Sequence, residues 1–267
     1  MSTRLVRPAA VAGTFYPAEP VTLRNWVTGA LRRADQRQPK SASRPRAIVV
    51  PHAGYVYSGD VAATAYATLG RAGAPIQCVV LFGPAHTIPV ATVAASSAEA
   101  FATPLGLAPT DTMTRDALVG SGRVAINDAA HAGEHSLEVQ VPFLQVALGD
   151  VMILPLLVGL VAPAAVIEVL EHVWDDVARL IVVSTDLSHY HDYPTATRLD
   201  RTTADAVVRR RPEILGPRSA CGLSALQGLV TFAAAHDVPV QLLDLRNSGD
   251  TAGPRDRVVG YGAFALI

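Results

Sequence analysis

The sequence contains few of the residues that mark several common protein classes. It has two cysteines in 267 residues, Cys78 and Cys221, too few for a disulfide-stabilised scaffold. No apolar run reaches the ~18 residues that a membrane-spanning helix needs. The first residues also lack the apolar centre of a secretory signal peptide. We therefore expect a cytoplasmic protein with no membrane partner.

Charge is also scarce and nearly balanced. Charged residues make up 17% of the chain, the formal net charge is −1, and Lys40 is the single lysine. A near-neutral chain argues against a nucleic-acid partner, which needs a positive surface. The hydrophobic content of 50% is typical of a globular chain. The polar stretch 35–46 is short enough to be a surface loop, and no longer linker follows, so we expect a single domain covering 1–267.

Apolar runs alternate with amphipathic segments along the chain. The runs that predict strands are 47–50, 78–82, 90–95, 151–158, 179–184, 240–245 and 258–266. The segments that predict helices are 21–34, 60–69, 111–119, 127–148, 164–177, 195–209 and 220–235. Apolar strands that alternate with helices predict an α/β fold with a central mixed, mostly parallel sheet flanked by helices.

Two histidines follow two of these strands. His52 comes after the run 47–50 and the strand-ending Pro51, and His86 comes after the run 78–82. Open α/β sheets bind their ligands at the carboxyl ends of the strands. The two imidazoles are therefore expected to face one pocket.

Three further clusters carry side chains that bind metals or transfer protons. Asp186 and His189 follow the strand 179–184, and Cys221 stands at the start of a predicted helix, where the helix dipole would lower its pKa. His135 and Glu138, three residues apart, share one face of a predicted helix. Imidazole, thiolate and carboxylate are the side chains that bind transition metals, and a carboxylate can orient a proton-transferring histidine.

Each of these residues also has a purely structural interpretation. A loop histidine is commonly solvated, which is how we interpret His172 and His236, and Cys78 reads as a core thiol within an apolar strand. Three alternatives stay open: Cys221 as a small buried residue, Asp186 as a helix cap beside a surface His189, and Glu138 as an exposed helix residue. Glycine-rich phosphate loops and the nucleophile elbow of serine hydrolases are absent.

Several motifs together resemble one protein family. The motifs are 12–17 (AGTFYP), 51–55 (PHAGY), 83–86 (GPAH), 134–138 (EHSLE), 184–189 (STDLSH) and 221–222 (CG). In this order and approximate spacing they resemble the MEMO family, whose prokaryotic members are called AmmeMemoRadiSam system protein B. The resemblance spans essentially the whole chain.

The resemblance implies a fold similar to the catalytic subunits of class III extradiol nonheme iron dioxygenases. It implies a metal site lined by His52, His86 and Cys221. Asp186 and His189 would lie beside it as catalytic residues, His189 as the acid/base, with His135 as a further catalytic pocket residue. Those dioxygenases bind iron with two histidines and one carboxylate, whereas Cys221 takes the carboxylate position here. A thiolate is a softer ligand than a carboxylate and suits copper(I), zinc or iron. We expect iron, with copper or zinc as alternatives.

Two functions are compatible with these residues. The first is a metal-dependent redox enzyme or dioxygenase-like protein acting on a small molecule or peptide. The alternative is a non-catalytic binding module that uses the same pocket to bind a peptide or a partner protein. The family name suggests radical SAM and AMMECR-type proteins as partners.

Overall fold

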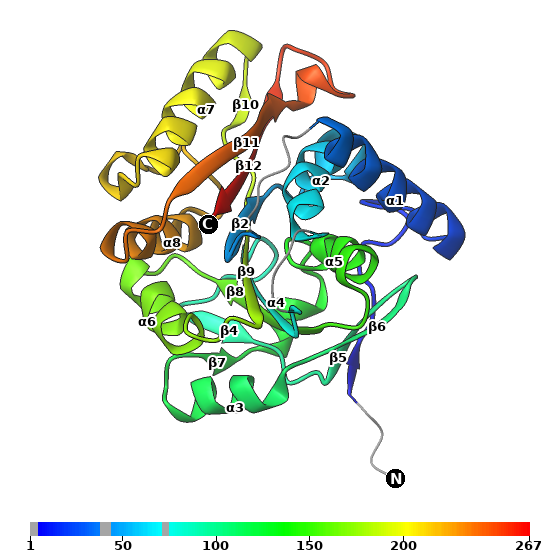
Figure 1. Ribbon diagram of the computed structural model, residues 1–267, viewed down its shortest axis with the longest axis vertical. Helices are drawn as coiled ribbons and strands as arrows, with labels where there is room; N and C mark the ends of the chain where they lie inside the picture. The colour runs from blue at the N-terminus through cyan, green and yellow to red at the C-terminus, as the bar shows by residue number, and fades with distance from the viewer. Residues whose placement is uncertain (1–4, 38–43, 71–74) are drawn as a thin grey trace.

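The computed structural model describes residues 5–37, 44–70 and 75–267. Four parallel strands form the centre of its large sheet. Their spatial order is β2 (Ala47–Val50), β9 (Arg179–Ser184), β3 (Cys78–Pro84) and β8 (Met152–Val158) (Figure 1). Strand β9 thus lies between β2 and β3, although in the chain it begins 129 residues after the end of β2 and 95 residues after the end of β3. The carboxyl ends of the four strands meet at one edge of the sheet.

Antiparallel strands extend the sheet on both sides. Strand β12 (Val258–Leu266) pairs with β2, and also with β11 (Val240–Asn247) and the short β10 (His189–His191). On the other side β4 (Val93–Ala95) pairs antiparallel with β8, and β7 (Ala125–Ile126) follows it. A separate three-stranded sheet contains β1 (Val6–Arg7), β5 (Ala100–Thr103) and β6 (Gly106–Pro109).

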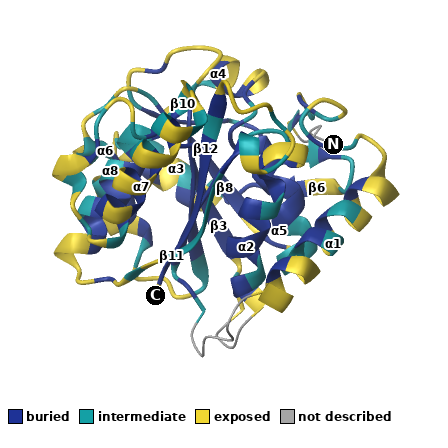
Figure 2. Cartoon of the chain, turned by 90° about the horizontal axis from the view of Figure 1, so that it is seen from above, coloured by how far each residue is buried: buried dark blue, intermediate teal, exposed yellow. Residues whose placement is uncertain are grey.

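Helices cover both faces of the large sheet (Figure 2). One face carries α1 (Pro20–Arg37), α2 (Asp60–Tyr66) and α5 (Val141–Leu148). The other face carries α3 (Thr112–Gly120), α6 (Pro163–Val173), α7 (Tyr193–Val208) and α8 (Leu223–Ala235). No helix within the described ranges is long and apolar enough to cross a bilayer.

The central strands are apolar at nearly every position because both of their faces are buried. In β2, Ile48 and Val50 pack with α1, α2 and α5, whereas Ala47 and Val49 pack into the core on the opposite face. Side chains alternate between the two faces of a strand, so a strand covered on both sides must be hydrophobic at every position. This is why the continuous runs in the sequence predicted these strands correctly.

The predicted fold class is confirmed, and the differences are local. The predicted helix 127–148 is three segments: α4 (Asp128–Ala132), a 3-10 turn (Glu138–Gln140) and α5. Between α4 and the 3-10 turn, the Glu134 carboxylate accepts hydrogen bonds from the backbone N–H groups of His135 and Ser136. A side chain that binds its own neighbouring amides competes with the helical pattern, which explains the break. Part of the predicted loop 35–46 lies outside the described residues.

Candidate metal centre

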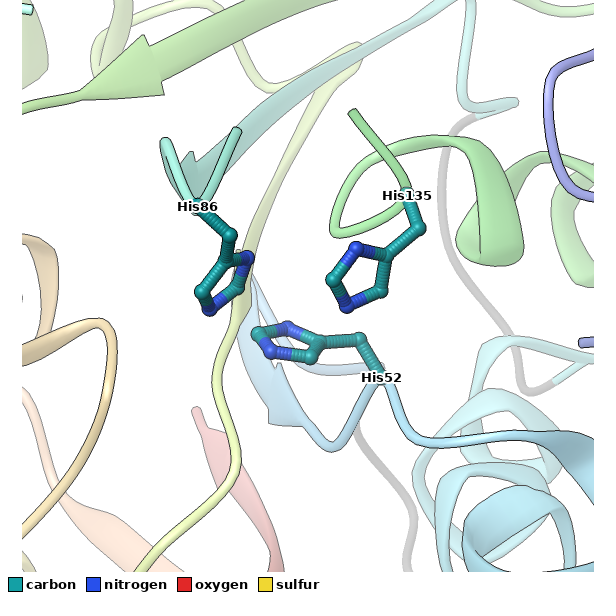
Figure 3. A group of neighbouring side chains, drawn as sticks. All are labelled: His52, His86 and His135. Carbon is teal, nitrogen blue, oxygen red and sulfur yellow. The ribbon is translucent and has the colours of Figure 1, made fainter. Parts of the chain in front are cut away.

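Three histidines converge at the carboxyl edge of the sheet (Figure 3). His52 follows β2, His86 follows β3, and His135 lies in the loop after α4. Their ligand-capable atoms all lie within 4.8 Å of one another. The ring centroids are separated by 5.2 Å for His52 and His86 and by 4.8 Å for His86 and His135. Two nitrogens bound to one ion lie at most about 4.2 Å apart, since metal–nitrogen bonds are about 2.1 Å long, so small side-chain movements would let this group share one metal ion.

One buried carboxylate orients two of these imidazoles. Glu134 Oε1 lies 3.0 Å from Nδ1 of His86 and 3.1 Å from Nδ1 of His135. Burial alone would raise the pKa of Glu134, but hydrogen bonds from His135, His86 and nearby backbone N–H groups hold the pKa well below its ordinary value. An ionised carboxylate only accepts hydrogen bonds, so both Nδ1 atoms carry a proton, and in the neutral form of each ring Nε2 keeps a lone pair.

His52 is held in the same tautomer by a different partner. The Ser184 hydroxyl donates to the carbonyl of Ser136 at 2.6 Å, so it can only accept from Nδ1 of His52, 3.1 Å away. The Nε2 atom of His52 therefore also keeps its lone pair. Burial lowers the pKa of His52 to about 4, although the Asp186 carboxylate opposes this shift. The imidazole is neutral near pH 7, as a metal ligand must be.

Cys221 lies next to His52, just before α8. Its Sγ is 3.3 Å from Nε2 of His52 and accepts a hydrogen bond from the Asp186 backbone N–H, also at 3.3 Å. Without a metal, burial and then the Asp186 carboxylate raise the pKa of the Cys221 thiol to about 12. The expected lowering by the helix N-terminus is therefore wrong, because burial penalises the thiolate more than the helix dipole favours it.

The loop after β9 supplies the predicted proton-transfer residues. The Asp186 Oδ1 atom accepts the backbone N–H of His52 at 2.8 Å, which fastens the end of β2 to the end of β9. The Nδ1 atom of His189 lies 2.9 Å from the carbonyl of Leu187, so it carries the proton in a neutral ring and Nε2 is free to accept one. The backbone carbonyl, rather than Asp186, supplies the hydrogen bond that orients His189.

Six of the residues singled out in the sequence line one cavity of about 750 Å³. They are His52, His86, His135, Asp186, His189 and Cys221. The structure groups His135 with His52 and His86, where the sequence interpretation had placed Cys221, and Cys221 lies at hydrogen-bonding distance from this group. The roles of the individual residues stay predictions.

The sequence interpretation missed two residues that orient the histidines, Glu134 and Ser184. Glu134 stands beside His135 in the chain, and that pairing of a carboxylate with a histidine was the available signal. Ser184 ends β9 and gave no signal of its own. Glu138, by contrast, is neither an exposed helix residue nor part of the cavity. It is 1% exposed and binds Arg7, Tyr16 and two backbone N–H groups of the N-terminal segment.

Comparison with known proteins places the chain in a family. A family model described as Memo-like protein matches residues 7–265. This chain belongs to the Memo-like protein family. A MEMO1 family protein of Ignicoccus hospitalis is 36% identical over 97% of this chain and 98% of its own length. A MEMO1 family protein of Thermotoga petrophila is 34% identical over 98% of this chain and 99% of its own.

A solved structure supports the fold. An uncharacterized protein from Escherichia coli K12 superposes with a TM-score of 0.53, covering 83% of this chain and all of that one. The two sequences are 14% identical, so this likeness bears on the architecture alone. The Memo-like chain thus combines an α/β architecture found in other solved proteins with a three-histidine group at the carboxyl edge of its sheet.

Proposed function

We propose that the protein is a nonheme metal-dependent oxidoreductase, with one iron ion held by His52, His86 and His135 and with Cys221 as a further donor. The observation that carries the proposal is the common tautomer of the three imidazoles. Their Nδ1 atoms are all occupied, by Glu134 or Ser184, which leaves Nε2 as the ligand atom in each. A structural histidine has no need of this arrangement three times in one cluster.

The donor set narrows the choice of metal. Imidazole nitrogens suit iron, copper and zinc, whereas the hard ions magnesium and calcium prefer oxygen ligands. The Cys221 sulfur, 3.3 Å from the His52 Nε2 atom, favours the softer members of this group. Iron is the metal we propose, with copper and zinc as the alternatives. A reducing cytoplasm suits the site because it keeps the Cys221 thiol out of disulfides.

The side chains around the ion have separable tasks. A redox-active ion at this position would exchange electrons with oxygen or with a substrate in the cavity. His189 is the acid/base, because its Nδ1–H is fixed on the Leu187 carbonyl and its Nε2 can take a proton from a substrate hydroxyl. Asp186 acts at the backbone, where it holds His52 in place.

The test is oxygen consumption by protein loaded anaerobically with Fe(II), measured with an oxygen electrode on addition of a panel of catechols and other reductants. We expect uptake faster than with free iron. The variant His189→Ala should retain stoichiometric iron but lose about 10²–10⁴-fold in rate, the usual contribution of a general acid/base.

One outcome would support the non-catalytic binding module instead. Oxygen uptake would then equal that of free iron and would be the same in the wild type and in His189→Ala. A stable complex with a peptide or partner protein, lost on substitution of cavity residues, would complete that case.

A further inference from the structure

A single arginine reaches the cavity that holds the three histidines. Among the described residues that line it, Arg257 is the only one with a permanent positive charge, and Asp186 is the only carboxylate. Asp186 is 4% exposed and already accepts the backbone N–H of His52. Arg257 is exposed at the rim, and no carboxylate of the described residues forms an ion pair with it.

An aromatic ring supports this guanidinium. The Arg257 Cζ atom lies 5.1 Å from the ring centroid of Tyr190. Tyr190 has a φ of 61° and is 63% exposed. The left-handed backbone region is unfavourable for a bulky side chain, and such residues are concentrated at ligand-binding positions. The backbone therefore presents Tyr190 at the cavity wall, beneath an arginine whose five donors are free for a ligand.

The rest of the cavity suits a flat, apolar molecule. Phe15, Tyr57 and Tyr261 line it together with Tyr190, and its 750 Å³ are within the range of small-molecule sites. Phe15 also packs against His135, with ring centroids 4.5 Å apart. A ligand in this space has aromatic walls, the three imidazoles at one end and a lone cation at the rim.

We infer that the substrate is a small organic carboxylate with a flat apolar body. Its carboxylate binds Arg257 and its body packs on Tyr190, which directs the opposite end toward the histidines. The planar guanidinium matches the two oxygens of a carboxylate with two parallel hydrogen bonds. A phosphate ester is less well matched, because among the described residues no second permanent cation lines the cavity for its second charge. This inference rests on the proposed function for the direction in which the substrate points.

The test is a titration of metal-free protein with benzoate and with benzamide, followed by calorimetry or by ligand-observed NMR. The two probes have the same size and differ in charge. Metal-free protein is used so that the carboxylate cannot be captured by an ion at the histidines. The wild type should bind benzoate about tenfold more tightly than benzamide at low ionic strength, as expected for one charge-assisted bidentate contact.

The variants decide where the carboxylate binds. Arg257→Gln should abolish the preference for benzoate. Arg257→Lys should retain part of it, because the positive charge stays while the two parallel hydrogen bonds of the planar guanidinium are lost. Arg255→Gln is the matched control: Arg255 also stacks on a tyrosine, Tyr193, at 4.6 Å, but does not line the cavity. It should bind like the wild type.

Three results would overturn the inference: no preference for benzoate, a preference that survives Arg257→Gln, or an equal loss in Arg255→Gln. Tighter binding of phenyl phosphate than of benzoate would replace the carboxylate by a phosphate ester. Because no metal takes part, the outcome is independent of whether the proposed oxidoreductase activity exists. An inactive protein with an Arg257-dependent preference for benzoate would refute the proposed function and leave the anion site standing.

Discussion

The Cys221 sulfur lies 3.3 Å from the His52 Nε2 atom, although the two residues are 169 positions apart in the chain. This contact joins the thiol before α8 to the imidazole after β2, beside the other two histidines. Under the proposed function this contact makes Cys221 a donor to the same ion as His52, and the contribution of the thiol can be separated from that of His135.

We therefore predict different losses of metal affinity for the two kinds of ligand, the histidines and the cysteine. His52→Ala, His86→Ala and His135→Ala should each weaken Fe(II) binding by more than about 100-fold, because an open coordination position refills with water. Cys221→Ser should weaken Cu(I) binding far more than Fe(II) binding, since a hydroxyl is a poor ligand for soft ions. The Fe(II) and Cu(I) content after anaerobic dialysis against a chelator measures both losses.

Cys78→Ser is the control for this comparison. Cys78 is buried at the start of β3 and does not line the cavity, so its variant should keep the metal affinities of the wild type. If instead Cys78→Ser loses copper and Cys221→Ser does not, the two thiols have been assigned the wrong way round. Full retention of Fe(II) by His135→Ala would return the ligand set to His52, His86 and Cys221.

The second prediction concerns Glu134, which orients two ligands without lining the cavity itself. Glu134→Gln removes the charge that fixes the Nδ1 protons of His86 and His135, so metal affinity should fall about 10–100-fold. Asp111→Asn is the matched control, because Asp111 is also buried but binds Arg179 and Thr114 and does not line the cavity. Competition with a fluorescent chelator gives the affinities, and equal losses in both variants would contradict an orienting role for Glu134.

The third prediction is that Glu138 contributes to stability and to the wall of the cavity. Glu138 pairs with the buried Arg7 and accepts the hydroxyl of Tyr16, so it fixes the segment that carries Phe15. Glu138→Gln leaves the Arg7 charge buried without its partner and should lower the free energy of unfolding by about 3–5 kcal/mol. Urea denaturation measures this loss. A change below about 1 kcal/mol would show that Arg7 reaches water or another partner.

The fourth prediction is a dependence of stability on pH that originates at Asp200, on α7. Burial raises the pKa of Asp200 to about 6, and hydrogen bonds from Ser188 together with the nearby His189 and His191 only partly oppose the shift. The ordinary pKa is about 3.9. The native state therefore binds the proton more tightly than the unfolded state. The stabilisation of the native state by this proton is complete below about pH 4 and is lost as the pH rises through 6.

Asp200→Asn should remove this loss while keeping an acceptor for the Ser188 backbone N–H, which lies 3.0 Å from Oδ1. Relative to the wild type, the variant should gain about 2–3 kcal/mol in the free energy of unfolding between pH 4 and pH 7, at about 1.4 kcal/mol per pKa unit. Chemical denaturation at a series of pH values measures the difference. A difference that does not change with pH would show that Asp200 has an ordinary pKa.

The sequence was most informative where a residue is determined by its immediate neighbours. The doubly buried strands β2, β3 and β9 are apolar at nearly every position, and His52 and His86 follow two of them directly, so both the strands and their ends could be predicted. The short strand β10 could not, because its three residues are polar and its pairing with β12 joins segments about seventy residues apart.

Contacts between residues far apart in the chain also explain what the sequence analysis missed at the site. The function of Glu134 depends on His86, 48 residues earlier in the chain, and no local pattern reports that contact. The pKa of Cys221 was predicted with the wrong sign because the helix start is visible in the sequence, whereas the extent of burial is not. Long-range contacts and desolvation therefore set the chemistry of residues whose identities alone are visible in the sequence.

The position of β9 between β2 and β3 determines when the proposed metal site can form. During synthesis, the histidines after β2 and β3 emerge long before the strand that separates them, and β12, which flanks β2, emerges last. The nascent chain therefore contains all three imidazoles before it contains the strand that sets the spacing between His52 and His86. Contacts between distant segments also form slowly. We expect an ion at the proposed site to enter only after β9 has paired with β2 and β3, so a supply of metal before that point is not needed for correct loading.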